Sequence, residues 1–178
     1  MQIYIPSKIE DIWRQPLPLM PISYLLLGGN LGDRQANLVA ARNGIAAFCG
    51  KVVAVSELYE TEAWGLKEQA PFLNQALAVD TPLSAEALLD MVLTIEASLG
   101  RVRDEKYGPR TIDIDLLFYD DAVISLPQLS IPHPHLHQRR FALVCLNDIA
   151  PQLIHPVLSK SVTQLLADCP DDSAVYKF

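Results

Sequence analysis

The sequence predicts an α+β fold with a ferredoxin-like βαββαβ core, in which an antiparallel sheet carries helices on one face and further helices are added at the C-terminal end. Short apolar runs alternate with stretches of helical period in the order strand, helix, strand, strand, helix, strand. The two middle strands follow each other without a helix between them, as in a hairpin. Such a sheet would leave its second face free to hold a site.

Length and composition indicate one globular domain. The chain has 178 residues, of which 50% are hydrophobic, enough to bury a core without a disulfide or a structural metal. We expect residues 23–178 to form this domain and the proline-rich residues 1–22 to be an extension. The net charge of −7 argues against binding to nucleic acid or to an anionic membrane. Three widely spaced cysteines, no apparent signal peptide and no long apolar run favour a cytoplasmic protein with reduced thiols.

The first strand and helix are predicted at residues 23–27 and 34–48. The strand ends in a Gly28-Gly29-Asn30 turn, and Asp33 is placed to cap the helix. This strand, turn and helix lack the third glycine of a dinucleotide-binding fingerprint and the Gly-Lys-Ser/Thr of a P-loop. We therefore do not expect a nucleotide to bind at this turn in either of those ways.

The middle strands are predicted at residues 51–58 and 72–79, joined by a connection that spans residues 59–71. Long connections without regular structure are often functional. Trp64 in this connection either covers a ligand or packs the loop onto its own domain, and the sequence leaves both possibilities open. Asn74 is polar within an apolar strand, so a buried amide would need partners, either the backbone or a flat hydrogen-bonding ligand.

The last strand of the core carries two acidic residues. It follows a helix that is predicted to begin after Ser84 and to stop at Gly100. Because side chains alternate along a strand, Asp113 and Asp115 share one face, about 7 Å apart. Two carboxylates so placed would repel each other, and they could share one or two Mg²⁺ ions whose other ligands are water and phosphate oxygens.

A local basic segment precedes these aspartates. Residues 101–110 contain four cations and two anions, so the rest of the chain has a net charge of −9. The four cations are Arg101, Arg103, Lys106 and Arg110. Such a cluster in an acidic protein fits a small anionic ligand such as a polyphosphate better than a polymer. Surface ion pairs are the structural alternative, but two polar residues on one face of an apolar strand argue against it.

Residues 131–141 contain His133, His135 and His137. Alternating histidines suggest zinc, but two prolines interrupt any regular strand there and no cysteine or carboxylate lies close in sequence, so we do not favour a zinc site. Arg139 and Phe141, near the start of a helix that runs to about residue 147, could instead present a further cation and an aromatic face. Residues 150–178 are expected to form a polar, partly helical closing segment.

Taken together, these motifs resemble the 6-hydroxymethyl-7,8-dihydropterin pyrophosphokinase family of folate biosynthesis. They follow the family's order from about Ser23 to Pro151, and the Gly-Pro-Arg-Thr-Ile-Asp-Ile-Asp string is the most specific of them. The matching pieces are Leu27–Asp33, Ser56–Thr61, Phe72–Ala76, Glu96–Arg103, Tyr107–Asp115 and Ile131–His133, with Arg139 and Phe141. The differences from many members are Gly29 in place of Ser, Tyr107 in place of Trp, Lys106 in place of Arg, and the N-terminal extension.

The resemblance implies transfer of pyrophosphate from ATP to the hydroxymethyl group of the pterin, with release of AMP. We expect the protein to be a cytoplasmic monomer. Two Mg²⁺ would bind at Asp113 and Asp115, and these aspartates with Arg101 and Arg110 would be catalytic. ATP contacts are implied at Glu96, Arg101, Arg103, Lys106, Arg110, Ile112, His133 and Arg139. Pterin contacts are implied at Gly28, Thr61, Glu62, Trp64, Phe72, Asn74, Asp113 and Phe141.

Two other classes of protein are less consistent with the sequence. A non-catalytic ferredoxin-like module that binds a nucleotide or RNA is disfavoured by the acidic net charge and by the paired aspartates. A kinase that transfers only the γ-phosphoryl group is disfavoured by the missing P-loop and protein-kinase signatures.

Overall fold

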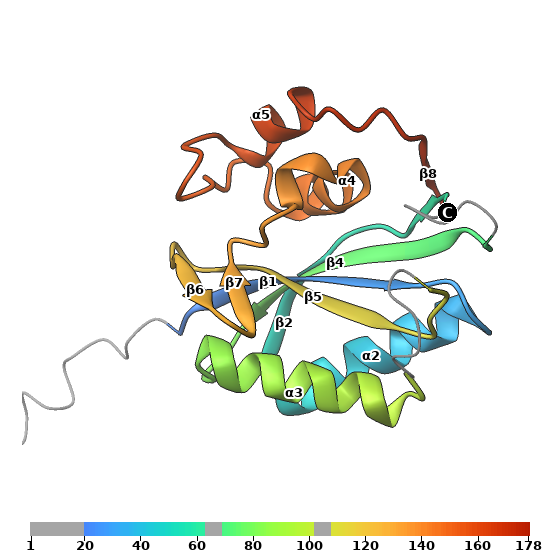
Figure 1. The fold of residues 1–178 in the computed structure, drawn as a ribbon. Coiled ribbons are helices and arrows are strands. Elements are labelled where there is room, and N and C mark those ends of the chain that lie inside the picture. Colours follow the sequence, from blue (N-terminus) through green and yellow to red (C-terminus); the bar gives the residue numbers. More distant parts are fainter. Residues whose placement is uncertain (1–19, 63–68, 102–107) are drawn as a thin grey trace, which may run out of the picture.

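The computed structural model describes residues 20–62, 69–101 and 108–178, and these form a mixed fold built on an antiparallel sheet (Figure 1). Strand β1 (Ile22–Gly29) lies at the centre, between β4 (Phe72–Asp80) and β5 (Asp113–Tyr119). The other edge of β4 pairs in succession with β2 (Lys51–Val55) and β3 (Tyr59–Thr61), and β8 (Val175–Lys177) pairs with β3. Every pairing between these strands is antiparallel.

Two helices cover one face of the sheet, as predicted (Figure 1). Helix α2 (Arg34–Phe48) has the predicted bounds, and the Asp33 side chain accepts a hydrogen bond from the Ala36 N–H. Helix α3 (Ala85–Ser98) begins after Ser84, whose hydroxyl accepts from the Ala87 N–H. Gly100, with φ of +81°, lies just beyond its end, which confirms the predicted stop at a residue that tolerates left-handed backbone.

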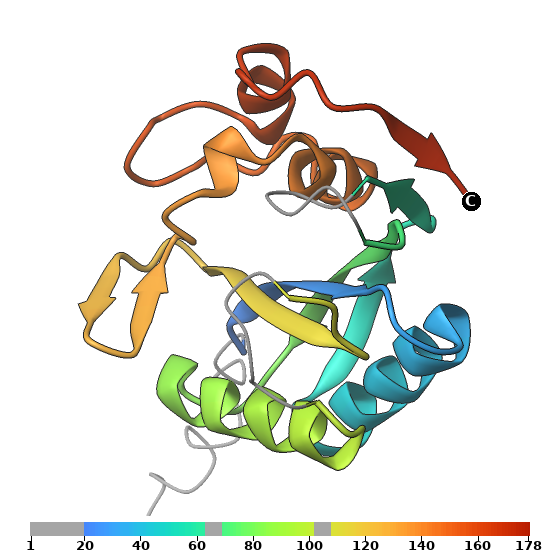
Figure 2. The same ribbon diagram turned by 45° about the vertical axis from the view of Figure 1, so that its right-hand side comes forward.

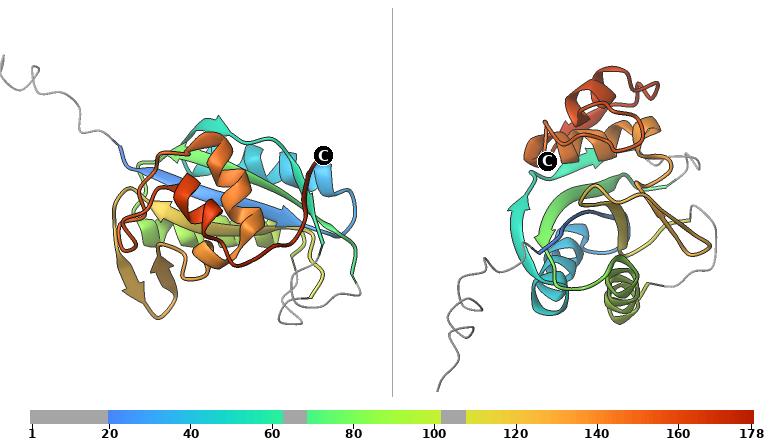
Figure 3. Two further views of the ribbon diagram at one scale, coloured as in Figure 1. Left: turned by 90° about the horizontal axis from the view of Figure 1, so that it is seen from above. Right: turned by 90° about the vertical axis from the view of Figure 1, so that its left-hand side faces the viewer.

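The opposite face is not left free, which corrects the expectation from the sequence. Helix α4 (Arg140–Ile149) packs across it and is followed by α5 (Val162–Ala167) (Figures 1 and 3). A short 3₁₀ turn, η1 (Leu136–Gln138), leads into α4. A hairpin of β6 (Ile124–Leu126) and β7 (Leu129–Ile131) projects beyond β5 (Figure 2).

The sheet therefore separates two apolar cores. The core under α2 and α3 contains alternate residues of β1 and β5, including Leu25, Leu27 and Ile114. The core under α4 contains the residues between them, including Leu26 and Leu117. Because β5 has carboxylates at two positions on the α4 side, part of that face is left for a polar site.

Two strand predictions were incomplete. The strand expected over residues 51–58 ends at Val55, because Ser56 interrupts it: the Ser56 hydroxyl accepts from the Ala76 N–H in place of regular pairing. The chain then pairs with β4 again through β3, so residues 59–61 form a strand and are not part of the loop that was expected to begin at residue 59. The closing segment, expected to be polar and partly helical, also contributes a strand, β8, to the sheet edge.

Two further expectations concern chemistry outside the site. The three cysteines are free, and Cys49 and Cys145 are buried, as expected for reduced thiols. Within the described ranges, no helix is long and apolar enough to cross a membrane.

Candidate active site

The two faces of β5 differ as the alternation of its sequence predicts. Ile112, Ile114 and Leu116 are buried in the core beneath α2 and α3. Asp113 and Asp115 point the other way and remain partly exposed. Asp113 lies opposite Gly28 of β1 in the register, so the aspartates lie beside the turn that ends the first strand.

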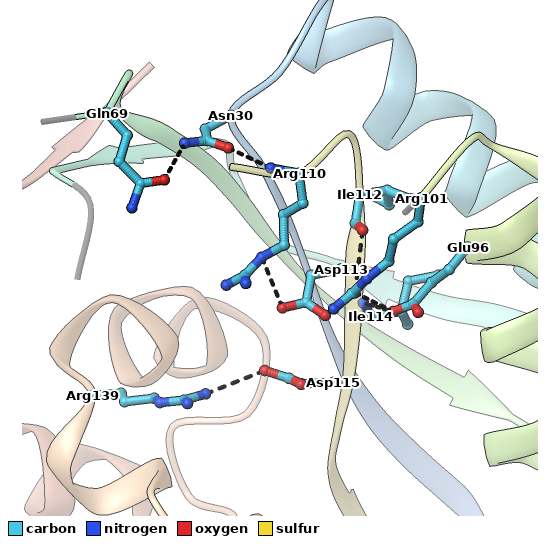
Figure 4. Close-up of polar contacts among 10 residues, drawn as sticks. All are labelled: Asn30, Gln69, Glu96, Arg101, Arg110, Ile112, Asp113, Ile114, Asp115 and Arg139. Carbon is cyan, nitrogen blue, oxygen red and sulfur yellow. Dashed lines mark hydrogen bonds and ion pairs between the residues drawn. The ribbon is translucent and has the colours of Figure 1, made fainter. Parts of the chain in front are cut away.

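Three arginines from separate parts of the chain converge on these aspartates (Figure 4). Arg101, after α3, contacts the Asp113 carboxylate and also donates to the carbonyl oxygen of Ile112 at 3.2 Å. Arg110 pairs with the other oxygen of Asp113, with its Nε 3.1 Å from Oδ2. Arg139, immediately before α4, donates to Asp115 Oδ2 at 3.2 Å from the opposite side.

Glu96 holds Arg101 from behind. Its side chain is 3% exposed, and Oε1 accepts from Arg101 Nη1 at 2.8 Å and from the Ile114 N–H at 2.7 Å. One carboxylate oxygen on α3 thus joins the last turn of the helix to β5 and orients a guanidinium toward Asp113. Glu96 lies at the cavity wall, where its direct effect is on Arg101.

Asp115 and His133 at this site have shifted pKa values. Burial raises the pKa of Asp115 to about 6, with a further increase from the charge of Asp113, while Arg139 and Arg110 act in the opposite direction. Burial lowers the pKa of His133 to about 4, and the nearby Arg139 and His135 lower it further. The two carboxylates therefore repel each other in a partly desolvated place, and additional positive charge there would relieve that repulsion.

A different set of groups lies at the β3 and β4 end. The amide of Asn74 is buried and donates to Thr61 Oγ1 at 2.9 Å. The ring of Phe72 lies 5.1 Å from the Arg110 guanidinium carbon. A Cβ at Gly28 would lie 2.9 Å from Asn74 Oδ1, so a side chain at this position would crowd that oxygen. The result is an aromatic face beside an amide, suited to a flat ring with hydrogen-bonding edges.

One cavity of about 1260 Å³ joins the two ends. Most of the residues expected from the sequence line it: Gly28, Thr61, Glu62, Phe72, Asn74, Glu96, Arg101, Arg110, Asp113, Asp115, His133, Arg139 and Phe141. Ile112 does not; its side chain is fully buried in the core, so only its backbone could meet a ligand. Trp64, Arg103 and Lys106 lie outside the described residues.

The cavity also has an arm that the sequence did not indicate. It runs between α3 and the β6–β7 hairpin, where Leu89, Leu93 and Leu116 supply apolar surface and Gln128 and Ser130 supply polar groups. No short motif marks these residues, since they come from three elements that meet only in the folded protein. The histidine run does not gather ligands: among described residues no three His, Cys, Asp or Glu side chains cluster as a metal site.

Asn30 was also missed. It is 4% exposed and lies at the junction of two chain segments (Figure 4). Its Nδ2 donates to the Ala70 carbonyl at 3.1 Å and to Gln69 Oε1 at 3.2 Å, while its Oδ1 accepts from the Arg110 N–H at 2.8 Å. The Gly-Gly-Asn turn could have suggested a buried amide, because Asn after two glycines is a common turn residue.

The fold and this site define a protein with a cavity suited to a small anionic ligand. Paired carboxylates, converging arginines and an aromatic, amide-bearing end lie in one cavity above an antiparallel sheet. Residues 24–151 match the family model described as 7,8-dihydro-6-hydroxymethylpterin-pyrophosphokinase, and the chain belongs to this family. It is a pyrophosphokinase of folate biosynthesis.

Similar proteins agree with this assignment. A 2-amino-4-hydroxy-6-hydroxymethyldihydropteridine pyrophosphokinase of Methylorubrum extorquens is 48% identical over 136 residues, covering 76% of this chain and 86% of the relative. The protein of the same name from Aquifex aeolicus is 39% identical over 145 residues, covering 82% and 90%.

Solved structures support the fold alone. Plasmodium falciparum HPPK-DHPS, the wild type with pteroate, superposes with a TM-score of 0.67 at 17% identity. The match covers 84% of this chain and 44% of that one, so the present chain spans less than half of the solved protein.

Proposed function

We propose that this enzyme transfers the β,γ-pyrophosphoryl group of ATP to the hydroxymethyl oxygen of 6-hydroxymethyl-7,8-dihydropterin, releasing AMP. The observation that carries the proposal is that one cavity places the aspartates and three arginines between an apolar arm and an aromatic, amide-bearing end. ATP and a flat bicyclic acceptor need this order of environments: base, phosphates, acceptor. The order β5-β1-β4-β2, with α2 and α3 on one face, supports describing the core as ferredoxin-like.

The donor set fits Mg²⁺. Asp113 and Asp115 offer only carboxylate oxygens, which suit a hard cation, and their mutual repulsion and the raised pKa of Asp115 would favour binding of a positive ion. Two protein carboxylates are enough for ions that keep waters and phosphate oxygens as their remaining ligands. We expect two Mg²⁺, which when bound would neutralise phosphate charge and lower the pKa of the acceptor hydroxyl.

The arginines supply the rest of the charge. Arg110 and Arg139 each contact a carboxylate here, and their forks would pass to phosphate oxygens when ATP binds. Arg101 stays oriented by Glu96 and adds a permanent positive charge beside Asp113. His133 is held neutral, so it can accept a hydrogen bond or donate one to a phosphate oxygen without adding charge.

The acceptor would lie at the other end. The ring of Phe72 and the ring of Phe141, both at the cavity wall, would sandwich the pterin, and Asn74 with Thr61 would bind its edge. The hydroxymethyl oxygen would then face the β-phosphorus. Its new bond to phosphorus forms as the bond from the β-phosphorus to the α–β bridging oxygen breaks, AMP leaves with that oxygen, and the hydroxyl proton passes to solvent. Holding both substrates in line is the main contribution of such a site.

The leading experiment identifies the nucleotide product. Purified protein incubated with Mg²⁺, ATP and 6-hydroxymethyl-7,8-dihydropterin should yield AMP and the pterin pyrophosphate, seen by chromatography. ADP as the sole nucleotide product would reject the proposal, and turnover that persists in excess chelator would reject the metal. We further propose that the enzyme is cytoplasmic, because its three cysteines are free, and that it is a monomer, which gel filtration tests.

A further inference from the structure

Arg34, the first residue of α2, links three segments that are distant in sequence. Its Nη1 donates to the Pro71 carbonyl at 2.8 Å and lies 2.7 Å from Glu60 Oε2. Its guanidinium carbon lies 5.7 Å from the ring centroid of Phe178. The Arg34 side chain is 23% exposed, so each of these contacts taken alone would be weak. Together, the carboxylate, the carbonyl and the ring restrain the orientation of the guanidinium.

These contacts fall on both sides of one part of the cavity wall. Glu60 precedes Thr61, and Pro71 precedes Phe72. Thr61 and Phe72 are opposite each other in the β3–β4 register, and both line the cavity at its aromatic end. Arg34 therefore connects the end of β3, through Glu60, and the start of β4, through Pro71, to the start of α2.

The C-terminal strand supports the same wall from outside. Strand β8 pairs with all three residues of β3, and the Phe178 N–H donates to the Leu58 carbonyl at 2.9 Å (Figure 2). Lys177 pairs with Glu57 at 2.7 Å. Without β8, β3 would be an edge strand of three residues, which is a weak element. Strand β8 and Phe178 lie beyond the 24–151 range that matches the family model.

We propose that Arg34, held by the Phe178 ring, is a positioning residue for the pterin end of the active site. It touches no substrate: it fixes Thr61 and Phe72 through their neighbours Glu60 and Pro71. The inference rests on the proposed function, because it assigns the Thr61 and Phe72 wall to the pterin. Its distinctive consequence is that disturbing Arg34 should weaken use of the pterin while leaving use of ATP almost unchanged.

The test compares Arg34→Ala with Arg42→Ala, which removes an arginine about two turns further along the same helix. In the full chain, we expect Arg34→Ala to raise the KM for the pterin by about 10-fold, by loss of positioning, with the KM for ATP changed by less than about 2-fold. Arg42→Ala should match the wild type in both. Arg34→Lys, which keeps the charge but not the fork, should recover only part of the pterin KM.

Phe178→Ala gives the second arm. Because the ring acts through Arg34, this variant should raise the pterin KM by less than Arg34→Ala, and the double variant should be no worse than Arg34→Ala alone. Additive effects would overturn the role of Phe178. Equal changes in both KM values, or a loss of activity that tracks the melting temperature alone, would show that Arg34 only stabilises the fold and would overturn its positioning role.

Failure of the proposed function is distinguishable. If the wild type forms no AMP from ATP and the pterin, both proposals fall. If the wild type is active and Arg34→Ala keeps the wild-type pterin KM, only the positioning role is wrong.

Discussion

The two faces of β5 are made by alternate residues of one strand, yet they serve the molecule in opposite ways. Ile112, Ile114 and Leu116 are at most 5% exposed and belong to the larger apolar core. Asp113 and Asp115, one residue away in each case, face a cavity and depend on arginines from other elements for charge balance. The apolar face stabilises the fold by burial, whereas the acidic face stores repulsion that a cation would relieve.

This contrast between the two faces of β5 indicates that stability and activity depend on different residues of the same strand. Removing apolar atoms from the core face should lower stability and leave the chemistry intact. Removing one carboxylate from the site face should abolish the chemistry and leave stability unchanged or higher. Substitutions on each face can therefore test whether the separation is as complete as the geometry indicates.

The largest effect is expected for Asp115→Ala. Losing one of the two carboxylates should lower kcat/KM by on the order of 10³-fold or more, because both the Mg²⁺ position and the alignment of the phosphates depend on it. Stability in chelator at neutral pH should not fall, since the ionised carboxylate is unfavourable in the folded state, as its raised pKa indicates. The control is Asp121→Ala in the exposed turn after β5, which should behave as wild type. A misfolded Asp115→Ala protein would contradict the separation.

Arg101→Ala should affect both properties, because Arg101 joins the site to the buried side of the sheet. Its loss should lower the rate by about 10² to 10³-fold, as for removal of one preorganised charge-stabilising group. It also removes a charge-assisted hydrogen bond from the buried Glu96, which should lower the free energy of unfolding by about 1–3 kcal/mol. Steady-state kinetics and urea unfolding measure the two effects; a rate change below about tenfold would make Arg101 a bystander.

Leu25→Ala probes the core face at a residue that does not itself line the cavity. Leu25 of β1 is fully buried and lies opposite Leu116 of β5 in the register. Truncation should lower the free energy of unfolding by about 3 kcal/mol through lost burial and the cavity left behind. At a temperature where the variant is fully folded, its KM for ATP should remain that of the wild type. A large rise in that KM would show that the two faces are coupled.

The sequence predicted the parts of this molecule that depend on local rules. Asp33 and Ser84 cap helices as expected, α2 has the predicted bounds, and the alternation of β5 places Asp113 and Asp115 on one face. In each case a helix cap or a two-residue period is decided by neighbours in the chain. The family resemblance then supplied thirteen of the residues that line the cavity.

The missing parts depend on contacts between distant segments. Three residues of β8 become a strand only because β3 offers an edge to pair with, and three residues carry little strand signal of their own. The arm of the cavity at Leu93 and Gln128 needs α3 and the hairpin to meet. The role of Arg34 depends on an aromatic ring 144 positions later in the chain. Such relations are properties of packing, which one sequence does not display.

The smallest effect should be a change in how stability depends on pH, and it again concerns the site face. His133 has its pKa lowered from 6.5 to about 4, chiefly by burial, so between these values the unfolded chain binds a proton that the folded protein does not. The contribution of His133 to stability is therefore fully present above about pH 6.5 and is lost as the pH falls toward 4. In His133→Gln this loss should disappear, so the wild type should lose on the order of 1–2 kcal/mol more than the variant between pH 7 and pH 4.5, allowing for partial exposure. Urea unfolding at several pH values in chelator measures the free energy of unfolding of both proteins. Because Asp115 titrates in the same pH range with the opposite effect on stability, the wild type and the variant are compared with each other at each pH. If the free energies of unfolding of the two proteins changed with pH in parallel, His133 would be protonated as easily in the folded protein as in the unfolded chain, and the prediction would be wrong.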